Sequence, residues 1–263
     1  MRGPGRLQAE SRLWGYLFLL GLLALWEVLA RAEMVNTLLF PRVSLILTYL
    51  GKLLTAGDIL AQVAISLARS LSAYLIAALF AISLGIVMGY YRVVYEVVEP
   101  FMEMLRPMPI VALIPVIILF LGLGWQMKVF IIFLACVWPI LLNTIDGVRG
   151  IDAVLVHTAR TLGASPMQLL RYVILPAALP VIVTGLRISV ATSLILMVIS
   201  EMIGGMNGIG FFILNAQRKM RVLDMFAGII ILGGIGYLFN FLFRLASNRL
   251  IHWHLGMTRL TRR

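Results

Sequence analysis

Six long apolar runs, separated by charged segments, limit the fold of this chain more than any other feature of its sequence. A helix of about 20 apolar residues crosses the roughly 30 Å hydrocarbon core of a bilayer and satisfies its own backbone hydrogen bonds there. We therefore predict an all-α polytopic membrane protein with about six transmembrane helices. The runs are Leu13–Ala30, Ala73–Tyr91, Met108–Leu123, Val129–Ile145, Leu175–Ser200 and Met225–Phe243.

Composition excludes several other classes of protein. Of the 263 residues, 62% are hydrophobic, whereas soluble domains hold about 45–50%. The net charge of +11 does not indicate nucleic-acid binding, because the basic residues flank apolar runs and form no stripe with interleaved aromatics. The single cysteine, Cys136, excludes a disulfide framework and a zinc cluster, and the three histidines lack the spacing of a metal site. We predict no metal or cofactor on this chain.

The basic residues also predict an orientation. With the N-terminus in the cytoplasm, the predicted cytoplasmic segments hold thirteen arginines, and the external segments hold seven lysines and arginines, as the positive-inside rule requires. A cleaved signal peptide is the alternative at the N-terminus, since Ala30 and Ala32 imitate a cleavage site. The run Leu13–Ala30 exceeds the usual apolar region of about 7–15 residues, and Arg31 lies inside that site, so we expect an uncleaved first helix.

These runs divide the chain into segments. Between the first two runs, apolar residues recur at helical spacing from Pro41 to Gly57, which predicts an external interfacial helix. The predicted segments are 1–12, a cytoplasmic N-terminal segment; 13–60, the first transmembrane helix and the external amphipathic segment; 61–250, the transmembrane core with a cytoplasmic loop at 146–175; and 251–263, a basic cytoplasmic tail.

Three prolines, Pro107, Pro109 and Pro115, lie within or beside the third run. Each removes a backbone donor and crowds the preceding turn, so this helix should be broken or kinked. Irregular backbone survives in a membrane only where it is buried in protein or lines a cavity. Pro109 and Pro115 are therefore candidates for a pathway through the membrane, and a proline-kinked packing helix is the alternative.

The fifth run carries two charged residues, Arg187 and Glu201. They lie about 20 Å apart along one helix, so they cannot pair with each other within it. Either both face a central pathway, where Arg187 attracts an anion, or they snorkel or pair with neighbours such as Glu103 or Asn143. Asn143 is a further pathway candidate, although buried amides such as Asn143 and Asn240 more often join helices.

The loop between the fourth and fifth runs contains two predicted short helices. Gly163 would end the first, Asp152–Leu162, by adopting a left-handed conformation. Ser165, Pro166 and Gln168 form a capping box that begins the second. The second helix should stop before a proline, Pro176, and present one apolar face made of Met167, Leu170, Val173 and Ile174.

This predicted helical hairpin has two interpretations. It is either an amphipathic connector that lies on the membrane, or a surface that inserts into a soluble partner. Small residues at its elbow favour insertion, because they permit close approach; these are Thr158, Ala159, Gly163 and Ala164.

The loop resembles the cytoplasmic "EAA" loop of inner-membrane subunits of binding-protein-dependent ABC importers. That loop has a small residue pair, then glycine, then an aliphatic residue, leucine and proline, but its leading acidic residue is replaced here by His157. Other motifs follow in the order and spacing of the branch that imports alkylsulfonates, taurine and nitrate. The loop positions to which the resemblance assigns ATPase coupling are His157, Thr158, Ala159, Gly163, Ala164, Ser165, Val173, Leu175 and Pro176. The other motifs are Ser66–Arg69, Glu99–Pro100, Leu105–Pro109, Leu121–Gly124, Pro139–Thr144, Gly185–Arg187 and Glu201–Gly204.

The resemblance implies a type I importer permease fold, a homodimer in the bacterial inner membrane, two cytoplasmic ABC ATPases that receive the loop, and an external solute-binding protein. ATP and Mg²⁺ would bind the ATPases, since this chain has no phosphate-binding loop motif. Two rivals are an ion-coupled secondary transporter and a membrane-embedded enzyme. The first would need titratable groups at mid-membrane and two repeated halves, and the second a nucleophile–base pair; neither pattern stands out in the sequence.

Overall fold

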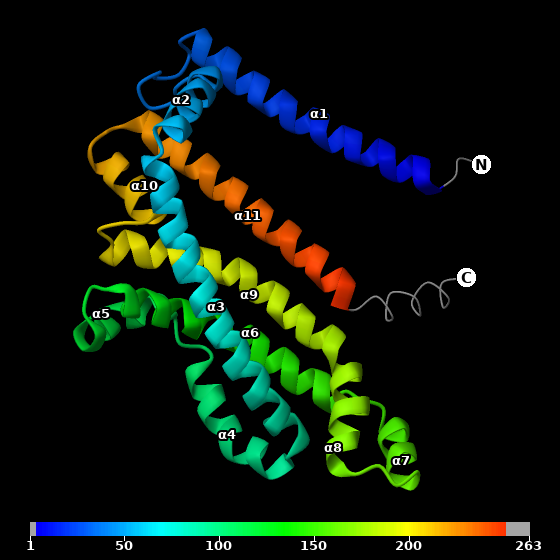
Figure 1. Ribbon diagram of the computed structural model, residues 1–263. Coiled ribbons are helices and arrows are strands. Elements are labelled where there is room, and N and C mark those ends of the chain that lie inside the picture. Colours follow the sequence, from blue (N-terminus) through cyan, green and yellow to red (C-terminus); the bar gives the residue numbers. More distant parts are fainter. Residues whose placement is uncertain (1–3, 251–263) are drawn as a thin grey trace. The chain divides into compact units, whose positions relative to one another are not determined.

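The computed structural model describes residues 4–250, and every regular element among them is helical (Figure 1). This confirms the predicted all-α class. The predicted tail 251–263, with His252 and His254, lies outside the described residues. The elements are α1 (Pro4–Arg31), α2 (Val43–Ala56), α3 (Asp58–Tyr90), α4 (Arg92–Leu105), α5 (Ile110–Leu121), α6 (Trp125–Arg149), α7 (Ala153–Thr161), α8 (Pro166–Leu169), the π-helical turn η1 (Leu170–Ile174), α9 (Leu175–Gly204), α10 (Ile209–Arg218) and α11 (Val222–Leu250).

Each predicted apolar run lies on one of these helices. Within the described residues, four helical segments are long and apolar enough to cross a membrane, and a bent pair makes a fifth if counted as one span. In addition, α1 contains the predicted first run, Leu13–Ala30. The four segments are Asp58–Tyr90, Trp125–Arg149, Pro166–Gly204 and Val222–Ser247.

The third run is broken, as its prolines predicted, but the break lies at its start. Helices α4 and α5 meet at 97° across the short segment that contains Pro107 and Pro109. Pro115 lies inside α5 without ending it. At 12 residues, α5 is about 18 Å long, too short to cross a bilayer alone. Helix α4 was not predicted, because charged residues interrupt its apolar positions.

The prediction that the second loop helix stops before Pro176 is wrong. The π-helical turn η1 joins α8 to α9, so that Pro166–Gly204 is a single 39-residue segment. A proline ring clashes with the carbonyl group four residues earlier in a regular helix. A π-helical turn widens the backbone at that point, which lets the helix continue through Pro176.

Helix α6 packs along α9 and also contacts α3, in the compact unit formed by Gln62–Phe211 and the described residues from Leu232. Gly85 and Gly89 of α3 lie four residues apart and face Thr144 and Val148 of α6; a Cβ atom on either glycine would lie within 2.7 Å of those side chains. On α9, a Cβ atom on Gly185 would lie 2.7 Å from the carbonyl oxygen of Pro139. Small residues at such crossings allow the backbones to approach closely, as in other membrane helix pairs.

The other compact unit contains the residues up to Ala61 and Phe212–Ile231. Its α2 is the amphipathic helix that the sequence predicted, and it ends at Gly57 with φ +84°. The Tyr49 hydroxyl donates a 2.6 Å hydrogen bond to Asp224, and this bond raises the pKa of Tyr49. Glu27 accepts hydrogen bonds from the backbone and side chain of Ser44, so α1 and α2 are joined by polar contacts as well as packing.

Candidate functional site

The hairpin formed by α7 and α8 has the local structure that the sequence predicted. Asp152 caps α7 by accepting a 2.8 Å hydrogen bond from the backbone of Val154. Gly163 has φ +80° and ends this helix. Ser165 and Gln168 form the reciprocal capping box of α8, with bonds of 3.3 Å and 2.8 Å. Because these bonds are local, the sequence alone was sufficient to predict the elbow.

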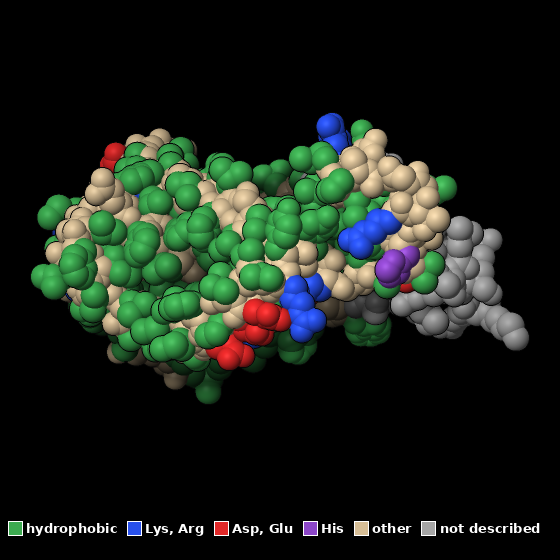
Figure 2. All heavy atoms as spheres, turned by 90° about the horizontal axis from the view of Figure 1, so that it is seen from below, with side chains coloured by type: hydrophobic (Ala, Val, Ile, Leu, Met, Phe, Trp, Pro, Cys, Tyr) green, Lys and Arg blue, Asp and Glu red, His purple; other side chains and the backbone are tan. Residues whose placement is uncertain are grey.

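The tip of the hairpin is an exposed surface. No residue of α7 is buried, and Leu162 beside the elbow is 82% exposed. His157 and Thr158 are exposed, and Ala159 and Ala164 are half-buried. Figure 2 shows one face of the molecule, where hydrophobic side chains cover much of the surface and basic side chains lie in a few places. A surface with small residues at its elbow and an exposed leucine beside them is suited to insertion into a groove.

The base of the hairpin is anchored in the core. Leu169 and Ile174 are buried against Val148 of α6 and against Ala178 and Ile182 of α9. The predicted apolar face is therefore partly wrong: Met167 is 69% exposed, and Leu169 takes its place in the core. The π-helical turn changes the angular position of the residues after Leu169, which a regular helical period does not anticipate.

The last three matching loop positions belong to this base rather than to the tip. Val173 and Leu175 are half-buried, and Pro176 is exposed near the start of α9. The structure therefore separates the loop positions into an exposed tip, residues 157–165, and an anchoring base.

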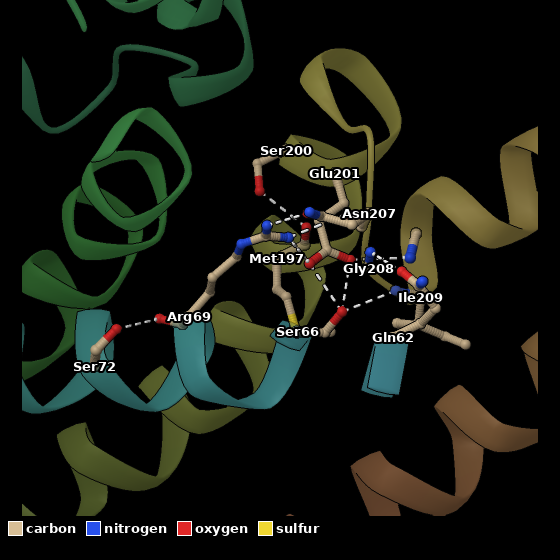
Figure 3. A network of polar contacts seen from close by, with 11 residues as sticks. Gln62, Ser66, Arg69, Ser72, Met197, Ser200, Glu201, Asn207, Gly208 and Ile209 are labelled. Atoms are coloured by element: carbon tan, nitrogen blue, oxygen red, sulfur yellow. Dashed lines mark hydrogen bonds and ion pairs between the residues drawn. The ribbon is translucent and has the colours of Figure 1, made fainter. Parts of the chain in front are cut away.

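A second polar site joins α3 to the end of α9 (Figure 3). Glu201 is wholly buried, and its carboxylate accepts a 2.8 Å charged hydrogen bond from Arg69, which is 4% exposed. Ser66 donates to the same carboxylate at 2.8 Å, and the backbone N–H of Gly210 donates at 3.0 Å. Arg69 also bonds the side chain and the carbonyl oxygen of Asn207. The network therefore fixes the connection between α9 and α10 against α3.

This network favours the second interpretation of Glu201, pairing with a neighbour, but with a different partner from those named. Its carboxylate does not face an open pathway in this chain, and its partner is Arg69 rather than Glu103 or Asn143. The sequence did contain a signal for this ion pair. Arg69 and Glu201 carry opposite charges near the ends of two apolar runs, and each needs a partner in a membrane. They lie 132 positions apart, so no local pattern pairs them.

A third feature is an open groove of about 750 Å³ between α9 and α11. Among the described residues that line it, Arg187 alone is charged and Asn240 alone carries an amide. Both side chains are exposed in this chain, so the prediction of a buried Asn240 is wrong. The remaining lining is apolar and includes Ala191, Leu194, Val198 and Leu232. A lone guanidinium group on an apolar wall is a suitable site for a small anion.

The other pathway candidates do not line this groove. Asn143 is half-buried on α6, and its side chain donates a 2.8 Å hydrogen bond to the carbonyl oxygen of Pro139 in the same helix. Pro109 caps the start of α5 and Pro115 lies within it. Of the pathway candidates predicted from the sequence, only Arg187 lines the groove, and Asn240 lies beside it there.

Among the residues that the structure describes, no three histidine, cysteine, aspartate or glutamate side chains are placed to hold a metal ion.

Comparison with protein families matches residues 81–252 to the family described as "Binding-protein-dependent transport system inner membrane component". A putative aliphatic sulfonates transport permease protein of Bacillus subtilis is 32% identical over 95% of this chain and 90% of its own length. A bicarbonate transport system permease protein of Synechococcus elongatus is 37% identical over 54% of this chain and 52% of its own length.

Among solved structures, a chain of the methionine ABC transporter MetNI in an inward facing conformation is similar, with a TM-score of 0.61. It is 20% identical, and the similarity covers 73% of this chain and 95% of that one. At this identity the similarity shows the fold alone, and it agrees with the permease fold that the motifs implied.

Proposed function

Because this chain belongs to the family of binding-protein-dependent transport system inner membrane components, and is thus the permease subunit of an ABC importer, we propose that its solute is a small anion moved by alternating access. The observation that carries the proposal is the groove between α9 and α11, where Arg187 is the one charged side chain on an apolar wall. Such a wall gives an anion a single point of attraction without binding it too tightly to leave.

Membership of the family implies ATPase and binding-protein partners, and the chain is a multi-pass inner-membrane protein. We infer that two ABC ATPases receive the exposed tip of the α7–α8 hairpin in the cytoplasm. The described residues of this chain contain one such hairpin, so two ATPases need a second hairpin, and we infer that a second copy of this chain supplies it. The excess of arginines on the predicted cytoplasmic segments supports termini that both face the cytoplasm.

The relatives support the class of solute. The permeases of Bacillus subtilis and Synechococcus elongatus are named for sulfonates and bicarbonate, which differ in shape but share a negative charge and several acceptor oxygens. A guanidinium group can bond either of them through two N–H donors. The proposal therefore extends to small oxyanions, with sulfonates first.

The proposal is tested by purifying the chain with its ATPase and binding protein and measuring uptake into proteoliposomes. Ethanesulfonate and bicarbonate would be compared with neutral and cationic solutes of similar size, and with taurine, whose sulfonate charge is balanced by an ammonium group. Uptake of a neutral or cationic solute alone would overturn the anionic class, and the mass of the purified complex would show whether it holds two copies of this chain.

We expect Arg187→Gln to lower anion uptake about tenfold or more, the effect of losing one charged hydrogen-bond donor. Complex assembly should be unchanged, because Arg187 is exposed in the groove. Arg244→Gln is the matched control, since Arg244 is exposed on α11 outside the groove lining. Normal uptake by Arg187→Gln would show that this side chain only snorkels.

His157→Ala should weaken coupling to the ATPase only modestly, by about 1 kcal/mol for one exposed hydrogen bond. His157 is exposed on α7, and its side chain replaces the acidic residue of the resembling loops. The measurement is the solute-stimulated ATPase rate of His157→Ala and His157→Glu in the same complex. Near-complete loss in the first variant with full activity in the second would show that position 157 carries the coupling.

A further inference from the structure

The start of α6 is an open and electropositive helix end. The helix begins at Trp125 after a loop that contains Gly122 and Gly124. Gly124 occupies the cap position, no side chain caps the helix, and its first turn has no acidic residue. A Cβ atom on either glycine would meet no atom within 4 Å. The two glycines thus leave room beside the start of this 25-residue helix, and the first N–H groups of the helix carry a partial positive charge.

Two buried cations lie near this helix end. Lys128, in the second turn of α6, is 3% exposed, and Arg69 is 4% exposed. Arg69 lies 5.2 Å from the centre of the Trp125 ring, and Lys128 is within electrostatic range of Arg69 and Glu201. Side chains on a helix lean toward its N-terminus, so Lys128 leans toward the open end of α6.

The charges of this cluster do not balance. Glu201 is its one carboxylate, and the oxygens of that carboxylate already accept from Arg69, Ser66 and Gly210. Within the described part of the chain, the buried Nε atom of Arg69 has no hydrogen-bond partner, and the carboxylate that acts on the Lys128 ammonium group is Glu201, which is already engaged by Arg69. A buried charge without a hydrogen-bonded partner is costly, so this cluster would favour a ligand of opposite charge.

We propose that the open end of α6, together with Lys128 and Arg69, binds a small oxyanion such as a sulfonate or a carboxylate. The oxyanion would accept from the Lys128 ammonium group and from first-turn N–H groups of α6, while Arg69 contributes its charge. Two sources share this chemistry: the free solute, in which case the inference rests on the proposed anionic solute, and a side-chain carboxylate of the binding protein.

Equilibrium binding of radiolabelled ethanesulfonate to the permease–ATPase complex in nanodiscs, without binding protein, tests the first source. Lys128→Met should weaken binding about tenfold or more, the loss expected for one charged donor, whereas Lys128→Arg should retain it. Lys52→Met is the matched control, because Lys52 is exposed on α2. If ethanesulfonate does not bind the wild-type complex, the affinity of the binding protein for the complex is compared between wild type and Lys128→Met.

Thermal stability separates this site from a structural role. Lys128→Met should raise the melting temperature of the anion-free complex, because it removes an unpaired buried charge. Ethanesulfonate or the binding protein should stabilise the wild type more than this variant. A lower melting temperature with unchanged binding of both would overturn the inference.

Failure of this site is distinguishable from failure of the proposed function. If Lys128→Met binds both probes normally while Arg187→Gln still loses anion uptake, the α6 site is rejected and the anionic solute stands. If the complex transports only neutral or cationic solutes, the anionic solute is rejected. In that case, the α6 site is accepted only if the binding protein has a lower affinity for the Lys128→Met complex than for the wild type.

Discussion

Gly163→Val is expected to abolish solute-stimulated ATPase activity while leaving membrane insertion intact. Gly163 has φ +80°, and a Cβ atom there would meet no neighbour within 4 Å. The penalty therefore comes from the backbone, and it amounts to about 1–2 kcal/mol for a residue with a Cβ in this region and more for a β-branched one. Ala159 of the tip packs against the core cluster, whereas Leu162 and Gly163 are exposed. The elbow itself can therefore respond by changing shape, and we expect a reshaped elbow not to fit the groove of the ATPase.

Two controls make this experiment specific. Gly163→Asn should retain most activity, because asparagine tolerates the left-handed conformation. Gly57→Val places the same residue at nearly the same φ, +84°, and also in open space, but at the end of α2. If Gly57→Val and Gly163→Val reduced ATPase stimulation equally, general backbone strain rather than hairpin shape would be responsible.

Glu201→Ala is expected to destabilise the protein by about 3–5 kcal/mol, the cost of leaving a buried charge unpaired. Ser66 and the backbone N–H of Gly210 would lose this acceptor, and Arg69 would lose its one charged partner and keep only the Asn207 oxygens. Thermal unfolding of the purified complex measures the loss. Glu103→Ala is the control, since Glu103 is exposed and surface substitutions usually change stability by less than about 0.5 kcal/mol.

A double variant tests the pairing itself. Arg69→Met combined with Glu201→Met removes both charges, so it should be more stable than either single variant. If the double variant lost as much as the sum of the single variants, the two side chains would contribute independently, and the ion pair would not be what fixes the α9–α10 connection.

Local chemistry explains which parts of this fold could be predicted from the sequence. The capping box at Ser165 and the left-handed Gly163 depend on neighbours within a few positions, so both were predicted. The proline-induced break before α5 was predicted for the same reason. The apolar runs themselves located the helices, since each must satisfy its backbone within itself in lipid.

The errors arise where distant residues or altered helical period decide the structure. The Arg69–Glu201 pair joins two helices, and the groove that contains Arg187 and Asn240 needs the packing of α9 beside α11. The π-helical turn before Pro176 could not be predicted, because the sequence pattern was interpreted with the period of a regular α-helix. The glycines that let α3 and α9 approach α6, such as Gly85 and Gly185, are visible in the sequence, but their partners are not.

The continuity of Pro166–Gly204 has a mechanical consequence. A regular helix of 39 residues is about 58 Å long; this segment begins just after the elbow at Gly163 and ends with the Arg69–Glu201 network. The elbow and the network are thus joined by continuous helical backbone. The π-helical turn, Pro176 and Pro180 are places along it where the helix can bend or twist. A movement of the elbow driven by ATP hydrolysis on one side of the membrane would therefore reach the opposite side as a small rotation of this single helical segment.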